Sequence, residues 1–349
     1  MKRVYSGIRA TGRLHLGNYF GAVKGMLELQ DTHDCVFSVV DLHTITVPYD
    51  PKTLQSDVRN IILDYLAAGL DPKKCKLEIQ SKVPQHTELA YLLSTIYPVS
   101  RLEDLPTYKD KKAQYPKYVN MGLLYYPILM AADILLYKAE LVPVGIDQEP
   151  HLEVAREMAR KFNSMFGHTF PEPQRFTSTG SVQVKLGEYI PSLLGEGKMS
   201  KSVEGSYINL VDDLETIKEK LAKVPTDSGV GEIKNRIYIS VQSASTEVGF
   251  TSPSRGLNVL MTLVELFQGK DKRVGYEEQY QSKGIRYQSL KDELAGAIHN
   301  YLKPIQEKRK EFEASPTLVD SILEESLNKC RKEAEKTILE VRQKMGLDV

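Results

Sequence analysis

The first half of the chain alternates short apolar runs with helical patterns, and this alternation limits the possible folds more than any other feature. The runs rich in β-branched and aromatic residues are 4–8, 35–40, 77–80 and 141–144. Helical spacing of apolar residues predicts helices at about 18–29, 51–68, 118–138 and 148–162. Asp147 is placed to cap the last of these helices, with Glu149 and Pro150 in its first turn. Strands that alternate with helices are typical of βαβ units on a parallel sheet. The sequence therefore predicts an α/β fold.

The second half has a different character. Strand-like runs become scarce after about residue 205, and amphipathic charged segments follow at 211–223, 254–268, 287–313 and 316–345. The stretch 225–256 contains Pro225, Gly229, Gly231 and Pro253 and is typical of a loop-rich junction. We therefore expect two domains, a parallel-sheet domain over 1–205 and a mainly α-helical domain over 206–349.

Composition narrows the class of protein. Lys plus Arg and Asp plus Glu number 46 each among 349 residues, so the chain has no global basic field for DNA. Its longest apolar run, 122–137, is too short to span a bilayer and contains Asp133. Three cysteines without a CxxC and seven histidines without an HExxH favour neither a disulfide framework nor a protein-held metal. We expect a cytoplasmic protein that binds neither membrane nor DNA.

Two polar segments suggest phosphate binding. The first expected strand leads into His15-Leu16-Gly17-Asn18 and then a helix, whose first free N–H groups can bind an anion. Taken alone, this pattern is weak, and an ordinary strand-to-helix turn with His15 at the surface is the better explanation. The second segment, Lys198-Met199-Ser200-Lys201-Ser202, follows Gly195 and Gly197, and two lysines on a glycine-hinged loop can clamp a polyphosphate. A solvated basic loop is the alternative, and the presence of both segments in one chain argues against it.

Asp133 is the one charged residue in the apolar stretch GLLYYPILMAADILLY. An ionised carboxylate there loses hydration worth several kcal/mol unless a donor binds it. Tyr126, Met130 and Asp133 follow i, i+4, i+7 spacing, so a helix places them on one face that could form the floor of a slot. Asp133 either awaits a donor that arrives with a ligand, pairs with a buried Lys or Arg, or caps a helix broken after Pro127.

The two segments together resemble the HIGH and KMSKS signatures of class I aminoacyl-tRNA synthetases. The chain length, GLLYYPILMAAD and VPVGIDQEPHLEVAREMARKFN are similar to bacterial tryptophanyl-tRNA synthetases, over most of the first 210 residues and more loosely beyond, as at LKPIQEKR (302–309). The resemblance implies a Rossmann-type nucleotide fold that holds ATP between the signatures, followed by a helical domain for the tRNA anticodon. It also implies a homodimer.

The resemblance assigns roles to individual residues. His15 and Asn18 would meet the ATP phosphates and Lys198 and Lys201 would clamp them, with Lys111 as a further phosphate contact beside the alternatives Lys109 and Lys112. The full ATP set is Arg9, Gly17, Asn18, Gly145, Asp147, Lys198, Met199, Ser200 and Lys201. Mg²⁺ would accompany the ATP.

An amino-acid site follows from the same resemblance. Asp133 would accept the indole N–H of tryptophan, with Met130 alongside and Gln148 at the polar end of the amino acid. The full set is Tyr5, Gly7, His43, Tyr126, Met130, Asp133, Val142, Val144 and Gln148. Two departures stand out: Arg9-Ala10-Thr11-Gly12 replaces the usual Gln-Pro-Ser-Gly, and Tyr5 carries a hydroxyl that the family commonly lacks.

The implied reaction is activation of tryptophan by ATP and transfer of the tryptophanyl group to tRNA(Trp). The candidate tRNA contacts are basic stretches at 109–117, 303–310 and 329–344, which a solvated helix face explains equally well. A tyrosyl enzyme is the nearest alternative. A small-molecule adenylyltransferase with the same nucleotide fold and a catalytically inactive paralogue are more distant ones.

Overall fold

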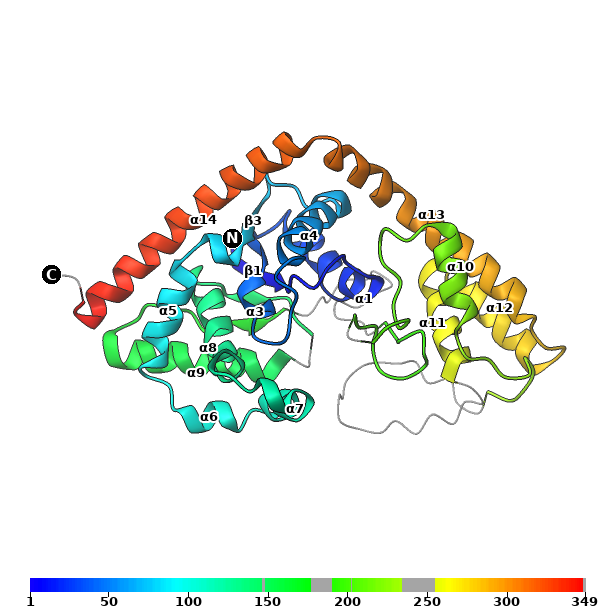
Figure 1. Ribbon diagram of the computed structural model, residues 1–349, viewed down its shortest axis with the longest axis horizontal. Coiled ribbons are helices and arrows are strands. Elements are labelled where there is room, and N and C mark those ends of the chain that lie inside the picture. Colours follow the sequence, from blue (N-terminus) through cyan, green and yellow to red (C-terminus); the bar gives the residue numbers. More distant parts are fainter. Residues whose placement is uncertain (146–147, 177–189, 202, 234–254, 348–349) are drawn as a thin grey trace. The chain divides into compact units, whose positions relative to one another are not determined.

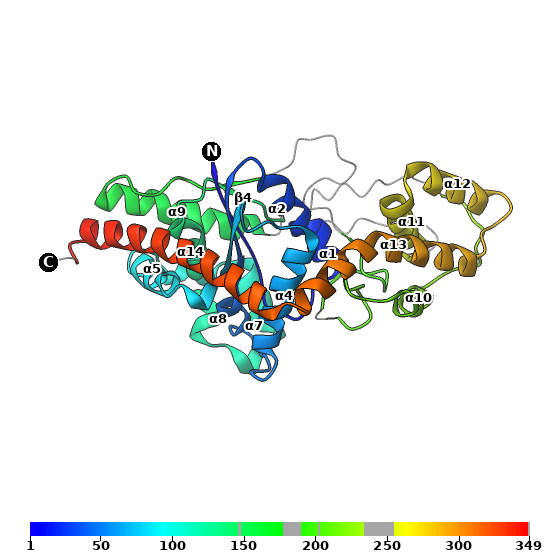
Figure 2. The same ribbon diagram turned by 90° about the horizontal axis from the view of Figure 1, so that it is seen from above.

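The computed structural model describes residues 1–145, 148–176, 190–201, 203–233 and 255–347. One parallel sheet runs in the order β3-β2-β1-β4-β5. Its strands are β1 (Arg3–Ile8), β2 (Asp34–Val39), β3 (Cys75–Ile79), β4 (Leu141–Val142) and β5 (Gln174–Arg175). The expected α/β fold on a parallel sheet is confirmed, and Figures 1 and 2 show helices of residues 41–166 packed around the strands.

The strand order places a switch point beside β1. The chain builds β2 and β3 on one side of β1 and returns to build β4 and β5 on the other. In open parallel sheets, ligands bind outside the carboxyl ends of the strands at such a point. Gly7 and Arg9 lie at that end of β1, and Val144 lies just beyond β4.

The helices fall in three groups along the chain. Residues 16–29 form one helical run, made of α1 (Leu16–Asn18), the π-helical η1 (Tyr19–Val23) and α2 (Lys24–Leu29). The helices between the strands are α3 (Asp41–Thr44), α4 (Leu54–Ala68), η2 (Gln80–Lys82), α5 (Gln85–Ser94), α6 (Val99–Glu103), α7 (Pro106–Gln114), η3 (Pro116–Tyr118), α8 (Met121–Leu136) and α9 (Glu149–Phe166). The later helices are α10 (Leu214–Ala222), α11 (Arg255–Gln268), α12 (Lys270–Gln281), α13 (Tyr287–Glu313) and α14 (Pro316–Met345).

Two compact units divide these elements, and neither is a single stretch of chain. Unit 1 consists of residues 1–12, 25–177 and 312–349, and unit 2 consists of 13–24 and 178–311. The sheet therefore belongs to unit 1 together with α14, while α10, α11, α12 and nearly all of α13 belong to unit 2. The domain boundary near residue 205 and the anticodon-binding role of the later part stay predictions.

Helix α14 covers the edge of the sheet at β3. The backbone N–H of Leu77 donates to Ser326 Oγ at 2.6 Å, and Lys76 Nζ lies 2.7 Å from Glu333 Oε1. Figure 1 shows α14 running along β3 and α5. An exposed edge strand can pair with a strand of another chain. Helix α14 covers the edge at β3 and binds polar groups of that strand, so it blocks such pairing.

Helix α8 contains most of the apolar stretch around Asp133 and lies in the core of unit 1. It packs against α5, α9 and β1, which explains why it is apolar on nearly every side. Asn120 caps its first turn by accepting the N–H of Leu123 at 3.0 Å, and Pro127 lies inside the helix without ending it. The alternative that Asp133 caps a helix broken after Pro127 is therefore wrong.

Several elements differ from the sequence-based expectations. The strand expected over 141–144 has only two residues, and the helix expected to end near residue 162 continues to Phe166. Helices α5, α6, α7 and α12 and strand β5 were not predicted. None of the helices in the described ranges is long and apolar enough to cross a membrane.

Candidate active site

Asp133 has three partners within the protein. Its side chain is 1% exposed; Oδ1 accepts from Gln80 Nε2 at 2.7 Å, and Oδ2 lies 2.8 Å from His43 Nε2. His86 Nδ1 forms an ion pair with Oδ1 at 2.7 Å. The expectation that Asp133 lacks protein partners is wrong, and the partner is neither Lys nor Arg. Sequence alone could not reveal these contacts because they join residues from four separate elements.

His86 lies between two carboxylates. Its Nε2 is 2.8 Å from Glu78 Oε1, and both side chains are fully buried. Burial lowers the pKa of His86, but the charges of Glu78 and Asp133 outweigh burial and raise the pKa to about 10. Burial would raise the pKa of Asp133, whereas His86 and His43 together hold that pKa below its usual range. His86 is therefore an imidazolium and Asp133 a carboxylate at neutral pH.

The other residues of the expected amino-acid site all lie in unit 1. On α8, Tyr126 and Met130 are half-buried above the buried Asp133. The remaining expected residues comprise the buried Tyr5, His43 and Val142, the half-buried Val144 and Gln148, and the exposed Gly7. The Tyr5 ring stacks on Tyr137, with centroids 5.7 Å apart, and the His43 and Tyr126 rings meet edge-on at 6.3 Å.

Sequence reasoning missed a polar cluster beside Tyr126. The Tyr126 hydroxyl donates to Thr107 Oγ1 at 2.8 Å and lies 2.6 Å from His151 Nε2. Thr107 Oγ1 itself lies 2.9 Å from the same nitrogen. A Tyr at this helix position carries no signal of these partners, because Thr107 is on α7 and His151 on α9.

Arg9 lies where the chain leaves β1. Its Nε is buried and has no hydrogen-bond partner among the residues that the structure describes. Burial lowers the pKa of Arg9, and the hydroxyls of Tyr115 and Tyr126 are the nearby groups that oppose this change. A buried guanidinium nitrogen without a partner can accept an anionic ligand at low cost, because its desolvation is already complete.

His15 and Asn18 bind each other across the start of α1. Asn18 N–H donates to His15 Nδ1 and His15 N–H donates to Asn18 Oδ1, both at 3.3 Å. His15 is 5% exposed, and burial followed by the charges of Lys201 and Lys198 lowers its pKa to about 3. The imidazole is therefore neutral, and because Nδ1 accepts a hydrogen bond, Nε2 carries the proton.

The two signature segments meet in unit 2. A Cβ added at Gly17 would lie 2.9 Å from the His15 ring and 3.2 Å from Met199 Cβ, so only glycine fits between them. Backbone hydrogen bonds join the N–H of Leu16 to Ile208 O and the N–H of Leu210 to Leu14 O, each at 2.9 Å. The segment after the first strand and the segment that contains the lysine loop thus form one local structure.

The lysine loop is held at both ends. Met199 is buried and its N–H donates to Ile190 O at 2.9 Å, while the buried Ser206 hydroxyl donates to Ser200 O at 2.6 Å. Lys198, directly before Met199, is exposed, and Lys201, between Met199 and Ser206, is half-buried. The loop therefore presents its lysines from a fixed backbone.

The remaining expected ATP residues are only partly described. Lys111 Nζ donates to Gln114 Oε1 at 2.8 Å and lies over the Tyr115 ring. The N–H of Gln148 donates to Gly145 O at 3.0 Å, and Asp147 is outside the described residues. Glu149 and Pro150 begin α9 as expected, directly after Gln148.

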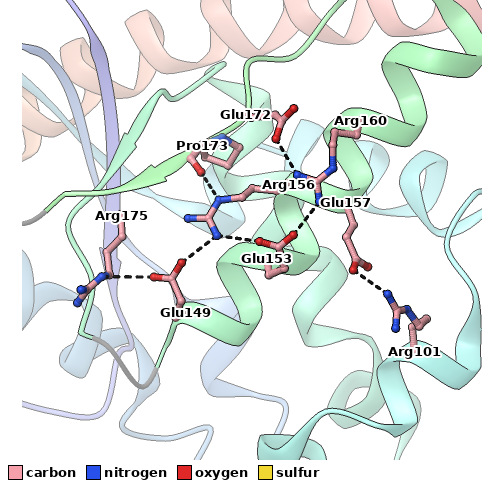
Figure 3. Close-up of polar contacts among 9 residues, drawn as sticks. All are labelled: Arg101, Glu149, Glu153, Arg156, Glu157, Arg160, Glu172, Pro173 and Arg175. Atoms are coloured by element: carbon pink, nitrogen blue, oxygen red, sulfur yellow. Dashed lines mark hydrogen bonds and ion pairs between the residues drawn. The ribbon is translucent and has the colours of Figure 1, made fainter. Parts of the chain in front are cut away.

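An ion-pair network fixes the start of α9 (Figure 3). Glu149 is bound by Arg156 at 2.8 Å and by Arg175 of β5 at 3.3 Å. Arg156 also donates to the Pro173 carbonyl at 2.8 Å. Glu153, Arg160 and Glu172 extend the network along the helix, and Arg101 and Glu157 form a separate ion pair beside it. These pairs are partly exposed and stabilise modestly one by one, but together they fix the first turns of α9, which Gln148 directly precedes.

Comparisons with known proteins agree with this arrangement. A family model described as tRNA synthetases class I (W and Y) matches residues 1–303. The chain is 38% identical over 347 residues to the tryptophan–tRNA ligase of Porphyromonas gingivalis and 39% identical over 349 residues to that of Helicobacter pylori, with 99% of each chain covered. A crystal structure of tryptophanyl-tRNA synthetase from Campylobacter jejuni, complexed with ADP and tryptophan, superposes with a TM-score of 0.81 at 30% identity and covers 99% of this chain and 100% of that one.

The parallel sheet, the joined signature segments and a match that runs along the whole chain lead to the same assignment. The chain belongs to the tryptophanyl-tRNA synthetases, within class I.

Proposed function

We propose that this chain activates L-tryptophan with ATP and transfers the tryptophanyl group to tRNA(Trp). In the first step the tryptophan carboxylate attacks the α-phosphorus of ATP, and pyrophosphate leaves. In the second, a ribose hydroxyl at the 3′ end of tRNA attacks the acyl carbon, and AMP leaves as the hydroxyl loses its proton. Neither step needs a covalent protein nucleophile, so positioning and cationic stabilisation supply the catalysis.

The observation that carries the substrate assignment is the buried, ionised Asp133 under half-buried side chains of α8. An indole brings a large apolar ring and one N–H donor. Met130 and Tyr126 are suited to the ring, and Asp133 to the donor. In analogous enzymes such a site discriminates by roughly 10⁴–10⁵ in kcat/KM against a substrate that lacks the N–H, whereas the hydrogen bond to a charged group contributes about 10- to 150-fold to affinity alone.

The remainder of the amino-acid site is assigned by resemblance. Tyr5, Gly7, His43, Val142 and Val144 surround the ring, and Gln148 binds the polar end of tryptophan. The Gln148 assignment is supported by its place at the start of α9, where ion pairs fix the backbone.

ATP binding is assigned to the joined signature segments of unit 2. His15 presents a protonated Nε2 to a phosphate oxygen while its Nδ1 holds Asn18 N–H. Lys198 and Lys201 neutralise charge that shifts to the leaving pyrophosphate, from a loop anchored at Met199 and Ser206. Gly17, Met199 and Ser200 let the backbone approach the nucleotide. Mg²⁺ enters with ATP as part of the substrate.

Four further residues belong to the ATP set that the resemblance implies. Arg9 supplies a buried guanidinium nitrogen whose anionic partner would be a phosphate or the tryptophan carboxylate. Lys111 is a further phosphate contact, and Gly145 and Asp147 approach the ribose. These roles rest on resemblance, with the unpartnered Arg9 Nε as support.

A cytoplasmic homodimer is part of the same proposal. Tyr91 and Val99 lie in the apolar region at 84–100 and are 66% and 55% exposed, so they are available to a partner subunit. Sedimentation velocity tests the assembly. A monomer at micromolar concentration would count against it.

Pyrophosphate exchange into ATP tests the activity. The purified chain is incubated with ATP, Mg²⁺ and labelled pyrophosphate, with tryptophan, with tyrosine, or with neither. We expect exchange with tryptophan alone. Exchange with tyrosine would select a tyrosyl enzyme, and exchange without any amino acid would indicate a different adenylyltransferase.

A further inference from the structure

We propose that Glu78 and His86 are positioning residues for tryptophan, and that His86, clamped between Glu78 and Asp133, fixes the Asp133 oxygen that receives the indole N–H. The inference rests on the proposed role of Asp133 as the indole acceptor. Neither Glu78 nor His86 is needed to touch the substrate.

The geometry assigns the acceptor position on Asp133. A carboxylate oxygen has about two lone-pair positions. Oδ1 accepts a hydrogen bond from Gln80 at 2.7 Å and is also occupied by the ion pair with His86 Nδ1 at 2.7 Å, a contact without hydrogen-bond geometry, whereas Oδ2 has His43 at 2.8 Å as its partner among the described residues. The second position of Oδ2 is therefore the one that a ligand donor can take.

Glu78 is an unexpected residue for its position. It lies on β3 with 0% exposure, in a parallel sheet whose strands are otherwise mostly apolar at buried positions. Replacing buried charged groups with apolar ones of similar volume is often neutral or stabilising, so stability alone is a weak reason to keep them. A carboxylate at this position has a specific effect instead, which is to hold His86 protonated.

The surroundings of His86 explain its charge. Glu78 and Asp133 face it directly, while Tyr5 of β1 and Tyr137 after α8 lie with ring centroids 6.4 and 5.8 Å from its own. Tyr137 donates its hydroxyl to Glu78. The titratable groups next to this cluster are His43, beside Asp133, and Cys330 of α14, whose burial raises its pKa. The two carboxylates are thus the groups that raise the pKa of His86 to about 10.

Glu78→Gln should make His86 titrate. The glutamine carbonyl can still accept from His86 Nε2–H, so the size and one hydrogen bond are kept, but one of two negative charges is lost. When His86 then loses a proton as pH rises, the remaining proton stays on Nδ1, which faces the Asp133 carboxylate, and a bare Nε2 lone pair faces the glutamine oxygen. That repulsion, together with the loss of the positive charge, would release the imidazole from its fixed position and Asp133 from its ligand-binding orientation.

The test compares tryptophan with an analogue in which sulfur replaces the indole N–H, β-(benzothienyl)alanine. Tryptophan affinity is read from indole fluorescence, because the chain contains no tryptophan, and the analogue is measured by competition. The wild type should prefer tryptophan by about 10- to 150-fold, the usual range for a hydrogen bond to a charged group, with little change between pH 6 and pH 9. Glu78→Gln should keep this preference at pH 6 and lose most of it at pH 9.

Two further variants sharpen the result. His86→Gln should show a reduced preference that does not depend on pH, because its amide cannot titrate, and it serves if Glu78→Gln does not fold. Glu277→Gln is the matched control, because it neutralises another buried carboxylate, paired with Arg273 at 2.7 Å in unit 2. It should behave as the wild type.

The outcomes separate the two claims. If the wild type binds tryptophan and the sulfur analogue equally well, Asp133 is not the indole acceptor, and the positioning role is contradicted as well. The positioning role alone is contradicted if Glu78→Gln and His86→Gln both keep the wild-type preference at pH 9. It is also contradicted if the variants lose affinity for tryptophan and for the analogue by the same factor.

Discussion

Two buried histidines of this chain differ in charge because their neighbours differ: His86 is cationic and His15 is neutral. His86 faces Glu78 and Asp133, which raise its pKa to about 10, whereas burial and the cations Lys201 and Lys198 lower the pKa of His15 to about 3. One imidazolium therefore pairs with acids, and one neutral imidazole is left to donate through Nε2. The residue type alone fixes neither state.

The charge of His86 makes stability depend on pH. Its folded pKa is raised above the unfolded value, so its contribution is fully present below about pH 6.5 and is lost as pH rises through about 10. We expect the unfolding free energy of the wild type, relative to His86→Gln, to fall in this window by at most about 1.4 kcal/mol per pH unit. Urea unfolding at several pH values measures it. A constant difference would contradict the assignment.

Lys201 should act on turnover more than on binding. Removing a group that stabilises charge in the transition state typically costs about 2.7–4 kcal/mol of barrier, or 10²–10³ in rate. Lys201→Ala should therefore slow pyrophosphate exchange by about that factor while tryptophan affinity stays near the wild-type value. Lys223→Ala, an exposed lysine of unit 2, is the control. Equal losses of rate and affinity in Lys201→Ala would argue against a clamp.

At the scale of elements, the sequence predicted most of what local patterns encode. The strands of the sheet core, the helix that carries Asp133 and the long later helices follow from periodicity and capping residues. Helix α12 was missed because its polar sequence has little apolar periodicity, and β5 because two residues leave no pattern. The signatures predicted a phosphate site, and their direct contact through Gly17 agrees with it.

What the sequence could not give is which elements meet. Asp133 contacts three residues, His43, Gln80 and His86, and the four come from four different elements. An amphipathic pattern predicts that a helix face is buried, but it does not predict which element packs against that face. For the same reason the packing of α14 on β3 was not foreseen, although the amphipathic pattern of that helix was.

The contact between α14 and β3 gives an element-scale prediction. Ser326→Ala leaves the buried N–H of Leu77 without its acceptor, and such a loss costs about 1–3 kcal/mol. Chemical denaturation should show that decrease. Ser282→Ala, which removes an exposed serine hydroxyl in unit 2, should change stability by less than about 0.5 kcal/mol. Similar effects of the two substitutions would contradict a structural role for the Ser326 contact.

At the scale of the whole molecule, one absence in the composition becomes useful. The 349 residues include no tryptophan, so any indole emission from the purified protein reports bound ligand. The substrate of the proposed reaction is thus its own probe, and its binding can be followed without labels.

That probe gives the most direct test of the claim that Asp133 receives the indole N–H. In Asp133→Asn the amide oxygen can take the place of Oδ1 toward Gln80 and His86, which leaves an NH₂ donor facing the indole donor. Fluorescence titration should show tryptophan affinity reduced by about 10- to 150-fold, with ATP affinity of the free enzyme unchanged. An unaltered tryptophan affinity in Asp133→Asn would contradict the account.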